Sequence, residues 1–304
     1  MSEHYKKLSK NSTNSDIRRI FKETSAHTNL QYDQFNTSTQ AIKRVREKKE
    51  EYVTSNLTTQ SLVVKSLWEF SLPMSKTIWH KVLNSVPRNI YSFSIRYTNN
   101  TLANGTNMYK WGRVDNPLCP SCNNPQTLGH VMGSCSVHLN EGRYNYRHNS
   151  ILLNLVKSII ESASIVMYAD IDGYKNPSII TGDAHRPDLV IIKDKKEVFI
   201  FELTVGFETN IEKNSINKAN RYENLLETLK LSFEKVTYVN LSMGALGTYG
   251  KSCHNLKRSL QNLGQSANEI EYNLYKLTNV CIRTSYFLFC SRNRAWDNPD
   301  LLSW

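Results

Sequence analysis

Two carboxylates in one stretch of the sequence have the spacing of a metal site. Asp188 and Glu202 lie at the outer ends of two apolar runs rich in Val, Ile and Phe, which flank a polar turn at residues 194–196. This pattern predicts a β-hairpin with a three-residue loop. If Lys193 faces Glu197, Asp188 faces Glu202, with the two Cβ atoms about 4.5–5.5 Å apart. Two like charges this close favour a cation between them, and oxygen ligands suit Mg²⁺.

The register of this hairpin leaves an alternative open. A two-residue loop would shift the pairing by one residue and send the two carboxylates to opposite faces of the sheet. Asp188 would then end a turn after Pro187, and Glu202 would be a solvated strand residue.

The charge of the chain is large and unevenly distributed. The 304 residues carry a formal net charge of +11. Residues 1–118 hold 18 Lys and Arg against 9 Asp and Glu, whereas residues 119–304 hold 20 against 18. This balance predicts a polyanionic partner, held by the basic half, and carboxylate chemistry in the later half. The six cysteines, without a signal peptide or a long apolar run, predict a reducing compartment and no membrane contact.

The basic half is predicted to be polar at first and helical later. Residues 1–40 are dominated by Ser, Thr, Asn, Gln and Lys, which predicts disorder. A charged helix is expected at residues 41–52, and short helices divided by prolines at residues 57–111. Arg88 and Arg96 alternate with three aromatic residues and are candidates for nucleic-acid binding. A helix that buries its aromatic face would give the same pattern.

The strongest local motif is a set of metal-ligating residues. Cys119, Cys122, His130 and Cys135 form a Cys-x2-Cys-x7-His-x4-Cys pattern, which is a complete tetrahedral ligand set for zinc. His138 could replace His130, because it lies three residues after Cys135. A closed set of four ligands predicts that the zinc folds the segment and takes no part in chemistry.

Periodicity predicts an α/β fold for the rest of the chain. Helices are expected from Gly142, over 210–233, with Ile216 on the buried face, and over 252–263 and 267–289. Strands are expected at 165–170 and 236–241, beside the hairpin. Cys253, Cys281 and Cys290 are predicted to be core thiols.

The order of these motifs resembles a known family. The Cys-Cys-His-Cys knuckle, Arg147-His148-Asn149, Arg186-Pro187-Asp188 with Glu202, and Lys218-x2-Arg221-Tyr222 follow one another along the chain. This order is similar to the C-terminal part of the polyprotein of site-specific non-long-terminal-repeat retrotransposons, which insert into ribosomal RNA genes. The resemblance covers about residues 60–295. It includes Trp68 to Trp111, which resemble the helical linker before the knuckle.

The resemblance implies a restriction-like endonuclease core of the PD-(D/E)xK class with a mixed four-stranded sheet. Composition predicts a polar, largely disordered N-terminal segment at 1–56, and the resemblance implies the linker at 57–114, the knuckle at 115–140 and the endonuclease domain at 141–295. Asp188 and Glu202 would hold Mg²⁺, and Lys218 would act with them. The classical lysine after the second acid is replaced by Thr204, and in this branch its role passes to the following helix.

The remaining implications concern supporting residues and partners. Arg221, Arg147 and His148 would support the site, with Arg147 or His148 contacting the DNA backbone or the metal shell. The nick would prime reverse transcription of the element RNA in the nucleus, at a double-stranded target. No reverse transcriptase is present, so the chain resembles a truncated or separately expressed part of the polyprotein. An inactive nucleic-acid-binding remnant and a junction or repair nuclease of the same fold are the alternatives.

Overall fold

The structure is a computed structural model that describes residues 38–60, 69, 71–159 and 164–303. The chain divides into two compact units between Lys65 and Ser66. The disorder predicted for the N-terminal segment falls mainly on residues 1–37, which lie outside the described residues, as does Trp68.

Helix α3 (Ser38–Gln60) is the described part of the first unit. It contains the charged helix predicted at residues 41–52, which is confirmed, and it continues past the predicted domain boundary at residue 56. Two ion pairs one turn apart stabilise it weakly, as expected of exposed pairs. They join Arg44 to Glu47 and Lys48 to Glu51, each at 3.0 Å.

The second unit is built on a mixed four-stranded sheet, as predicted, with the strands in the order β1-β2-β3-β4. The β1–β2 and β2–β3 pairs are antiparallel and the β3–β4 pair is parallel. A parallel pair needs a crossover, which helix α11 (Ile211–Lys230) supplies. The strands are β1 (Ile165–Ala169), β2 (Leu189–Lys193), β3 (Glu197–Gly206) and β4 (Lys235–Gly244).

The hairpin of β2 and β3 has the predicted register. Lys193 pairs with Glu197, and Leu189 pairs with Phe201. The loop at residues 194–196 is closed by a hydrogen bond from the Lys196 amide to the Lys193 carbonyl, at 3.0 Å. Asp194 and Lys195 both have positive φ values, of 53° and 57°, which match the right-handed twist of the two strands. The next positions outward from Leu189 and Phe201 are therefore Asp188 and Glu202.

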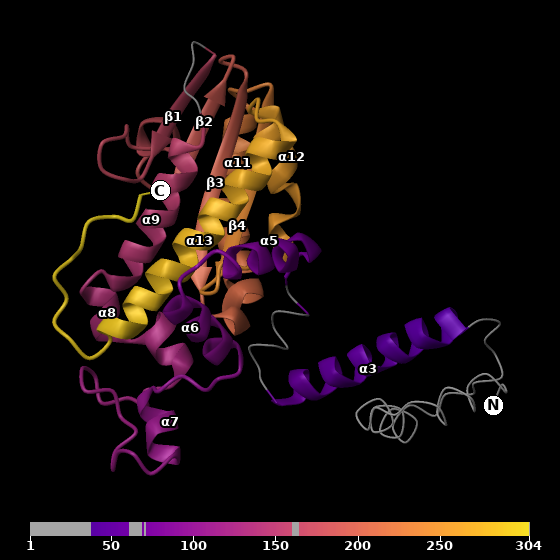
Figure 1. Ribbon diagram of the computed structural model, residues 1–304. Helices are drawn as coiled ribbons and strands as arrows, with labels where there is room; N and C mark the ends of the chain where they lie inside the picture. Colours follow the sequence, from indigo (N-terminus) through magenta and orange to yellow (C-terminus); the bar gives the residue numbers. More distant parts are fainter. Residues whose placement is uncertain (1–37, 61–68, 70, 160–163, 304) are drawn as a thin grey trace. The chain divides into compact units, whose positions relative to one another are not determined.

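Helices cover both faces of the sheet (Figure 1). One face packs against α9 (Arg143–Lys157), with α13 (Ala267–Ser291) and α5 (Pro73–Leu83) completing the larger core. The other face packs against α11 through a smaller apolar cluster. Burial on both sides explains why β2 and the first half of β3 are continuous apolar runs.

The predicted linker packs as part of this second unit. Helix α5 begins at Pro73 and α6 follows Pro87, so the two prolines begin the helices as predicted. Both helices pack against α13, which begins with a capping box formed by Ser266 and Glu269. The other elements are α6 (Arg88–Thr98), α7 (Gly105–Lys110), η2 (His130–Ser134), α8 (Ser136–Asn140), α10 (Ser178–Thr181), η3 (Glu208–Asn210), η4 (Lys251–Asn255) and α12 (Leu256–Asn262).

The chain after α13 returns along α9. Trp296 packs edge-on against Tyr146 and Phe287. The Leu302 amide donates to the Ser150 hydroxyl at 3.1 Å, and the Asn154 amide donates to the Leu302 carbonyl at 2.7 Å. This segment therefore belongs to the α/β unit, which extends past the predicted end at residue 295.

Two predictions about burial are wrong. Cys253 and Cys281 are core thiols as predicted, but Cys290 is exposed, because it lies on the solvent side of the last turn of α13. Ile216 is 55% exposed. Ser215 is buried in its place, because its carbonyl and hydroxyl accept hydrogen bonds from Asn240 of β4. The first half of α11 thus presents polar groups to the sheet.

The hairpin turn gives a test of this register. Lys195→Gly removes the side chain from a left-handed backbone position, so we expect it to raise the free energy of unfolding by about 1 kcal/mol in urea titrations. Lys196→Gly, one residue later and outside the left-handed region, is the control and should not stabilise the protein. Destabilisation by Lys195→Gly would contradict this turn geometry.

Candidate functional site

Asp188 and Glu202 lie together at the end of the β2–β3 hairpin. They occupy the register position after the Leu189–Phe201 pair, as the sequence predicted. Residues two apart on a strand share a face, so both carboxylates belong to the face that packs against α11. The Leu203 amide donates to Asp188 Oδ2 at 2.7 Å and fixes the aspartate against β3.

Glu202 is a buried carboxylate with one free oxygen. Its side chain is 1% exposed, and Lys218 Nζ of α11 donates to Oε1. Among the described residues, no hydrogen bond of normal geometry reaches Oε2, although this atom is buried; the Tyr222 hydroxyl lies close enough to the carboxylate to stabilise its charged form. Burial, and then the charge of Asp188, raise the pKa of Glu202, while Lys218 opposes the shift by stabilising the carboxylate. The free oxygen is a vacant acceptor beside a second carboxylate.

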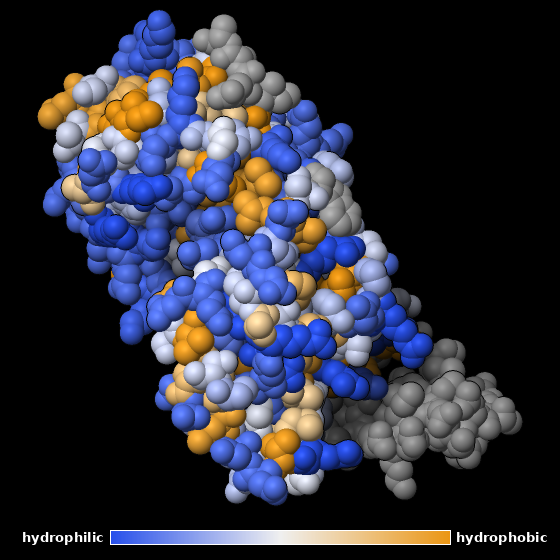
Figure 2. Space-filling view, turned by 90° about the vertical axis from the view of Figure 1, so that its left-hand side faces the viewer, coloured by the Kyte–Doolittle hydropathy of each residue, from blue (hydrophilic) through white to orange (hydrophobic). Residues whose placement is uncertain are grey.

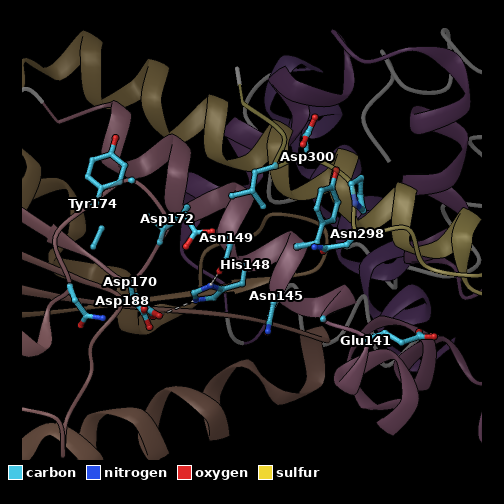
Figure 3. Close-up of a pocket in the computed structure, with 18 of the residues that line it drawn as sticks. Glu141, Asn145, His148, Asn149, Asp170, Asp172, Tyr174, Asp188, Asn298 and Asp300 are labelled. Atoms are coloured by element: carbon cyan, nitrogen blue, oxygen red, sulfur yellow. Dashed lines mark hydrogen bonds and ion pairs between the residues drawn. The ribbon is translucent and has the colours of Figure 1, made fainter.

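His148 of α9 approaches Asp188 from the other side (Figure 3). Its Nε2 lies 3.3 Å from Asp188 Oδ1, and its Nδ1 lies 2.9 Å from Asn149 Oδ1. Burial disfavours the imidazolium, but the Asp188 carboxylate overcomes this effect and raises the pKa of His148 to about 9. At neutral pH the carboxylate pair therefore lies between two cations, His148 and Lys218.

Two tyrosines that sequence reasoning did not select as site residues surround Glu202. The Tyr222 hydroxyl donates to the Arg186 carbonyl at 3.2 Å, and the Tyr238 hydroxyl is buried with no partner among the described residues. Burial, and then the charge of Glu202, raise the pKa of both phenols, so both stay neutral. Tyr238 could have been found from strand periodicity, because it lies on β4 two residues before Asn240, which pairs with Glu202.

Arg221 lies beside the site and does not touch the carboxylates. Its guanidinium group lies over the ring of Tyr222, with 5.8 Å between the guanidinium carbon and the ring centroid. Arg221 is exposed, and within the described residues it forms no ion pair with Asp188 or Glu202. The predicted adjacency of Arg221 and Lys218 on one helix is correct, but only Lys218 reaches Glu202.

Arg147 is a structural residue, so the expectation that it contacts DNA is wrong. Its side chain is fully buried, with a relative exposure of 1%. It donates to the carbonyl groups of Met132 at 2.9 Å and Val205 at 3.3 Å, and to the Ser285 hydroxyl at 3.3 Å. These contacts join the metal-ligand segment, β3 and α13 and leave no surface for a phosphate.

A polar cavity of about 1180 Å³ opens beside Asp188 and His148 (Figure 3). Asp170 enters it because β1 pairs with β2, and the Asp170 amide donates to the Asp188 carbonyl at 2.9 Å. Arg186 forms an ion pair with Asp170. Other carboxylates in the lining come from distant segments, and sequence reasoning did not find them because only the fold brings them together. They are Glu141, Asp172 and Asp300.

The predicted Cys/His ligands form a compact cluster. The candidate ligand atoms of Cys119, Cys122, His130 and Cys135 all lie within 4.8 Å of one another. Cys122 Sγ is 3.3 Å from His130 Nε2 and 3.7 Å from Cys135 Sγ. Three sulfurs and one imidazole at these distances could bind a metal such as zinc. His138 is not the fourth member of the cluster, because its Nε2 lies 3.1 Å from the Arg292 carbonyl.

Arg88 and Arg96 are exposed on α6, as nucleic-acid binding would require. Two of the three aromatic residues that accompany them are core residues. Phe93 and Tyr97 are buried and contact each other edge-on, and Phe93 also packs against Tyr286 and Phe289. The interpretation as a buried aromatic face is therefore correct for these two residues, and nucleic-acid contact by the arginines stays a prediction.

No family model matches the chain, and no curated protein matches it. Among the described helices, none is both long enough and apolar enough to span a membrane.

The cluster predicts which histidine binds metal. We expect His130→Ala and Cys122→Ser to lower the zinc content of the purified protein, measured by mass spectrometry of the metal, because each removes one of four ligands. His138→Ala is the matched control and should keep the metal. Loss of zinc in His138→Ala with retention in His130→Ala would reverse the ligand assignment.

The buried contacts of Arg147 predict that its substitution destabilises the protein. Arg147→Met removes a buried guanidinium group and three hydrogen bonds, two of them to backbone carbonyl groups, so the free energy of unfolding should fall by about 2–4 kcal/mol. Arg96→Met, at an exposed position of α6, should change it by less than about 0.5 kcal/mol. Urea titrations followed by circular dichroism measure both. Equal stability of the two variants would contradict the structural role.

Proposed function

We propose that this protein is a metal-dependent DNA endonuclease of a non-long-terminal-repeat retrotransposon. The observation that carries this proposal is the buried Glu202 carboxylate, which lies beside Asp188 in the strand register. Lys218 donates to its Oε1, and its Oε2 has no hydrogen bond of normal geometry among the described residues. A folded protein rarely leaves a buried acceptor unpaired, and such exceptions are concentrated at sites that bind something.

The order of elements around these residues supports the proposal. Helix α9, strands β1 to β3, helix α11 and strand β4 follow one another, with β4 parallel to β3. This is the arrangement expected of the PD-(D/E)xK core that the sequence resembles. Asp188 immediately precedes β2, Glu202 lies within β3 and Lys218 lies in the first half of α11, and these are the elements on which that core would hold its acids and its lysine. Fold likeness alone gives no activity, so the proposal depends on these side chains.

The carboxylates fit a hard divalent cation. Among the described residues, Glu202 Oε2 has no hydrogen bond of normal geometry, and Asp188 Oδ1 has a polar contact only with His148. The Asp188 side chain is 14% exposed. Oxygen ligands from two carboxylates, completed by water, suit Mg²⁺. When bound there, Mg²⁺ would lower the pKa of a coordinated water and neutralise charge on the scissile phosphate.

The protein's own residues would orient the reactants. The Leu203 amide holds Asp188 in place, and burial holds Glu202, so neither carboxylate has to be ordered when substrate binds. Lys218 is 32% exposed and would donate to a phosphate oxygen as negative charge develops on it. His148, protonated at neutral pH, would hold the Asp188 side chain in its orientation.

The charge around the site indicates the side from which DNA would approach. Asp170, Asp172 and Asp300 line the cavity next to His148 and would repel phosphates. Lys218 and Arg221 lie on the α11 side, where Arg221 is exposed. A duplex would therefore contact α11 through its backbone, since phosphate contacts position DNA without reading its sequence.

The remaining roles follow from the same proposal. The Cys/His cluster would bind structural zinc and fold its segment. The nick in a double-stranded target would leave a 3′-hydroxyl that primes reverse transcription of the element RNA. The partners would be target DNA, this RNA and the reverse transcriptase of the same polyprotein, in the nucleus.

A nicking assay on supercoiled DNA with Mg²⁺ tests the proposal. We expect Asp188→Ala and Glu202→Gln to reduce nicking to background, because each removes a ligand of the proposed metal. Lys218→Met should slow it roughly 100-fold or more through the loss of charge stabilisation. Asp172→Asn is the control, because it lines the cavity without belonging to the carboxylate pair, and it should nick like the wild type.

The same assay separates the alternatives. Nicking that is unchanged in Asp188→Ala would refute the assignment of the site. Binding of DNA with a steep salt dependence, but without nicking by the wild type, would favour a nucleic-acid-binding remnant. Faster cleavage of four-way junctions than of linear duplex would favour a repair nuclease.

A further inference from the structure

Helix α7 and the turn after it expose a large aromatic side chain next to basic ones. Trp111, at the C-cap of α7, is 48% exposed, and Lys110 and Arg113 lie on either side of it in the sequence. In the described part of the chain, neither cation forms an ion pair with a carboxylate. An exposed tryptophan with free cations beside it needs an explanation, because tryptophan is usually largely buried.

The position of Trp111 is fixed by the backbone. The Trp111 amide donates to the Asn107 carbonyl at 3.0 Å, and the Arg113 amide donates to the Met108 carbonyl at 2.9 Å. Gly112 between them has a φ of 65°, which allows the chain to turn back at the helix end. The aromatic ring is therefore presented by an ordered cap, and a ligand would pay little conformational entropy for it.

A hollow of about 290 Å³ lies against the ring. It is lined by Met108, Trp111 and Arg113. A thioether, an indole and a guanidinium group all interact favourably with the face or edge of another aromatic ring. The hollow therefore suits one planar ring of moderate size.

The hollow is joined rigidly to the Cys/His cluster. The Gly105 amide at the start of α7 donates to Gln126 Oε1 at 2.8 Å, and the Gln126 amide donates to the Pro117 carbonyl at 2.9 Å. Leu118 pairs with Pro125 across the turn that carries Cys119 and Cys122. A Cβ atom on Gly105 would lie 2.8 Å from the Pro117 carbonyl oxygen, so only glycine permits this approach.

The charge of this region favours an anionic ligand. From Arg88 to Leu118 the chain has four basic side chains and one acidic one. Hydrophobic residues and strongly hydrophilic ones alternate at the lower end of the face in Figure 2, at the height of α7 in Figure 1. A membrane surface would require a continuous apolar face, which the side of this end seen in Figure 2 does not present.

The geometry points to a binding site for single-stranded nucleic acid, in which an unpaired base stacks on Trp111 within the hollow. Lys110 and Arg113 contact the phosphates on either side of that base. Bases in a duplex are already stacked on one another, so a duplex offers this site only its backbone. The site is separate from Asp188 and Glu202 and goes beyond the proposed cleavage of duplex DNA.

Fluorescence anisotropy with labelled oligothymidine, oligouridine and duplex DNA tests this site, without added magnesium. Trp111→Ala should weaken binding of the single strands roughly 5- to 150-fold, the range of one base–aromatic stack. Trp111→Phe should retain most of the affinity, because it keeps an aromatic face. Lys110→Gln and Arg113→Gln should each reduce the slope of log affinity against log salt by about 0.7. Comparison of oligothymidine with oligouridine shows whether single-stranded DNA or single-stranded RNA binds more tightly.

Two controls separate this proposal from general surface effects and from the nuclease site. Tyr272→Ala removes another exposed aromatic side chain beside a lysine, on α13, and should bind like the wild type. Binding is measured without magnesium, whereas the proposed nicking requires it, so failed nicking and failed binding are distinguishable. Unchanged affinity of Trp111→Ala for single strands, equal dependence of duplex binding on Trp111, or Trp111-dependent binding of an acidic peptide would each overturn the proposal.

Discussion

The structure depends on the opposition of two carboxylates at one position of a β-hairpin. At the separation of directly paired strand residues, about 5 Å, two negative charges repel by roughly 3 kcal/mol at an effective dielectric constant near 20. Asp188 and Glu202 lie side by side despite this repulsion, although Glu202 is almost fully buried. Lys218 and protonated His148 compensate for it from opposite faces of the sheet. These cations come from the two helices that flank the sheet, so the pair requires the whole α/β layer arrangement.

Arg147 holds the segment that carries the Cys/His cluster against these α/β layers. It lies on the same helix as His148, but its side chain points into the core and donates hydrogen bonds to Met132, Val205 and Ser285. The neighbouring residues of one helix thus have different roles, since His148 reaches Asp188 and Arg147 joins three elements. A change in the Cys/His segment would be transmitted to β3 through this guanidinium group, three residues from Glu202.

The molecule carries two kinds of surface for an anionic polymer. Near Asp188 the cavity is rich in carboxylates, two of which are paired with His148 and Arg186, and the cations Lys218 and Arg221 lie on the α11 side. Near Trp111 an aromatic ring is accompanied by cations without ion pairs in the described chain, beside a hollow of moderate size. The first surface suits a backbone held for chemistry through a metal ion. The second suits a base held by stacking, so the two surfaces would select differently structured parts of a nucleic acid.

The sequence alone determined the features that depend on local spacing. The two apolar runs and the polar turn between them predicted the hairpin and offered two registers, one of which opposes Asp188 and Glu202, and the knuckle spacing predicted four mutually close ligands. Helical periodicity located α9, α11 and α13. Local spacing did not distinguish His130 from His138, because both histidines satisfy the spacing of a zinc ligand. It also did not show whether Arg147 is buried or available to DNA, because the sequence pattern is the same in both cases. The tertiary structure decided these by supplying distant partners, such as the Arg292 carbonyl for His138. It also exposed Cys290 and Ile216 and brought Asp170 and Tyr238 to the site, because burial and neighbours depend on how elements pack, which no single segment encodes.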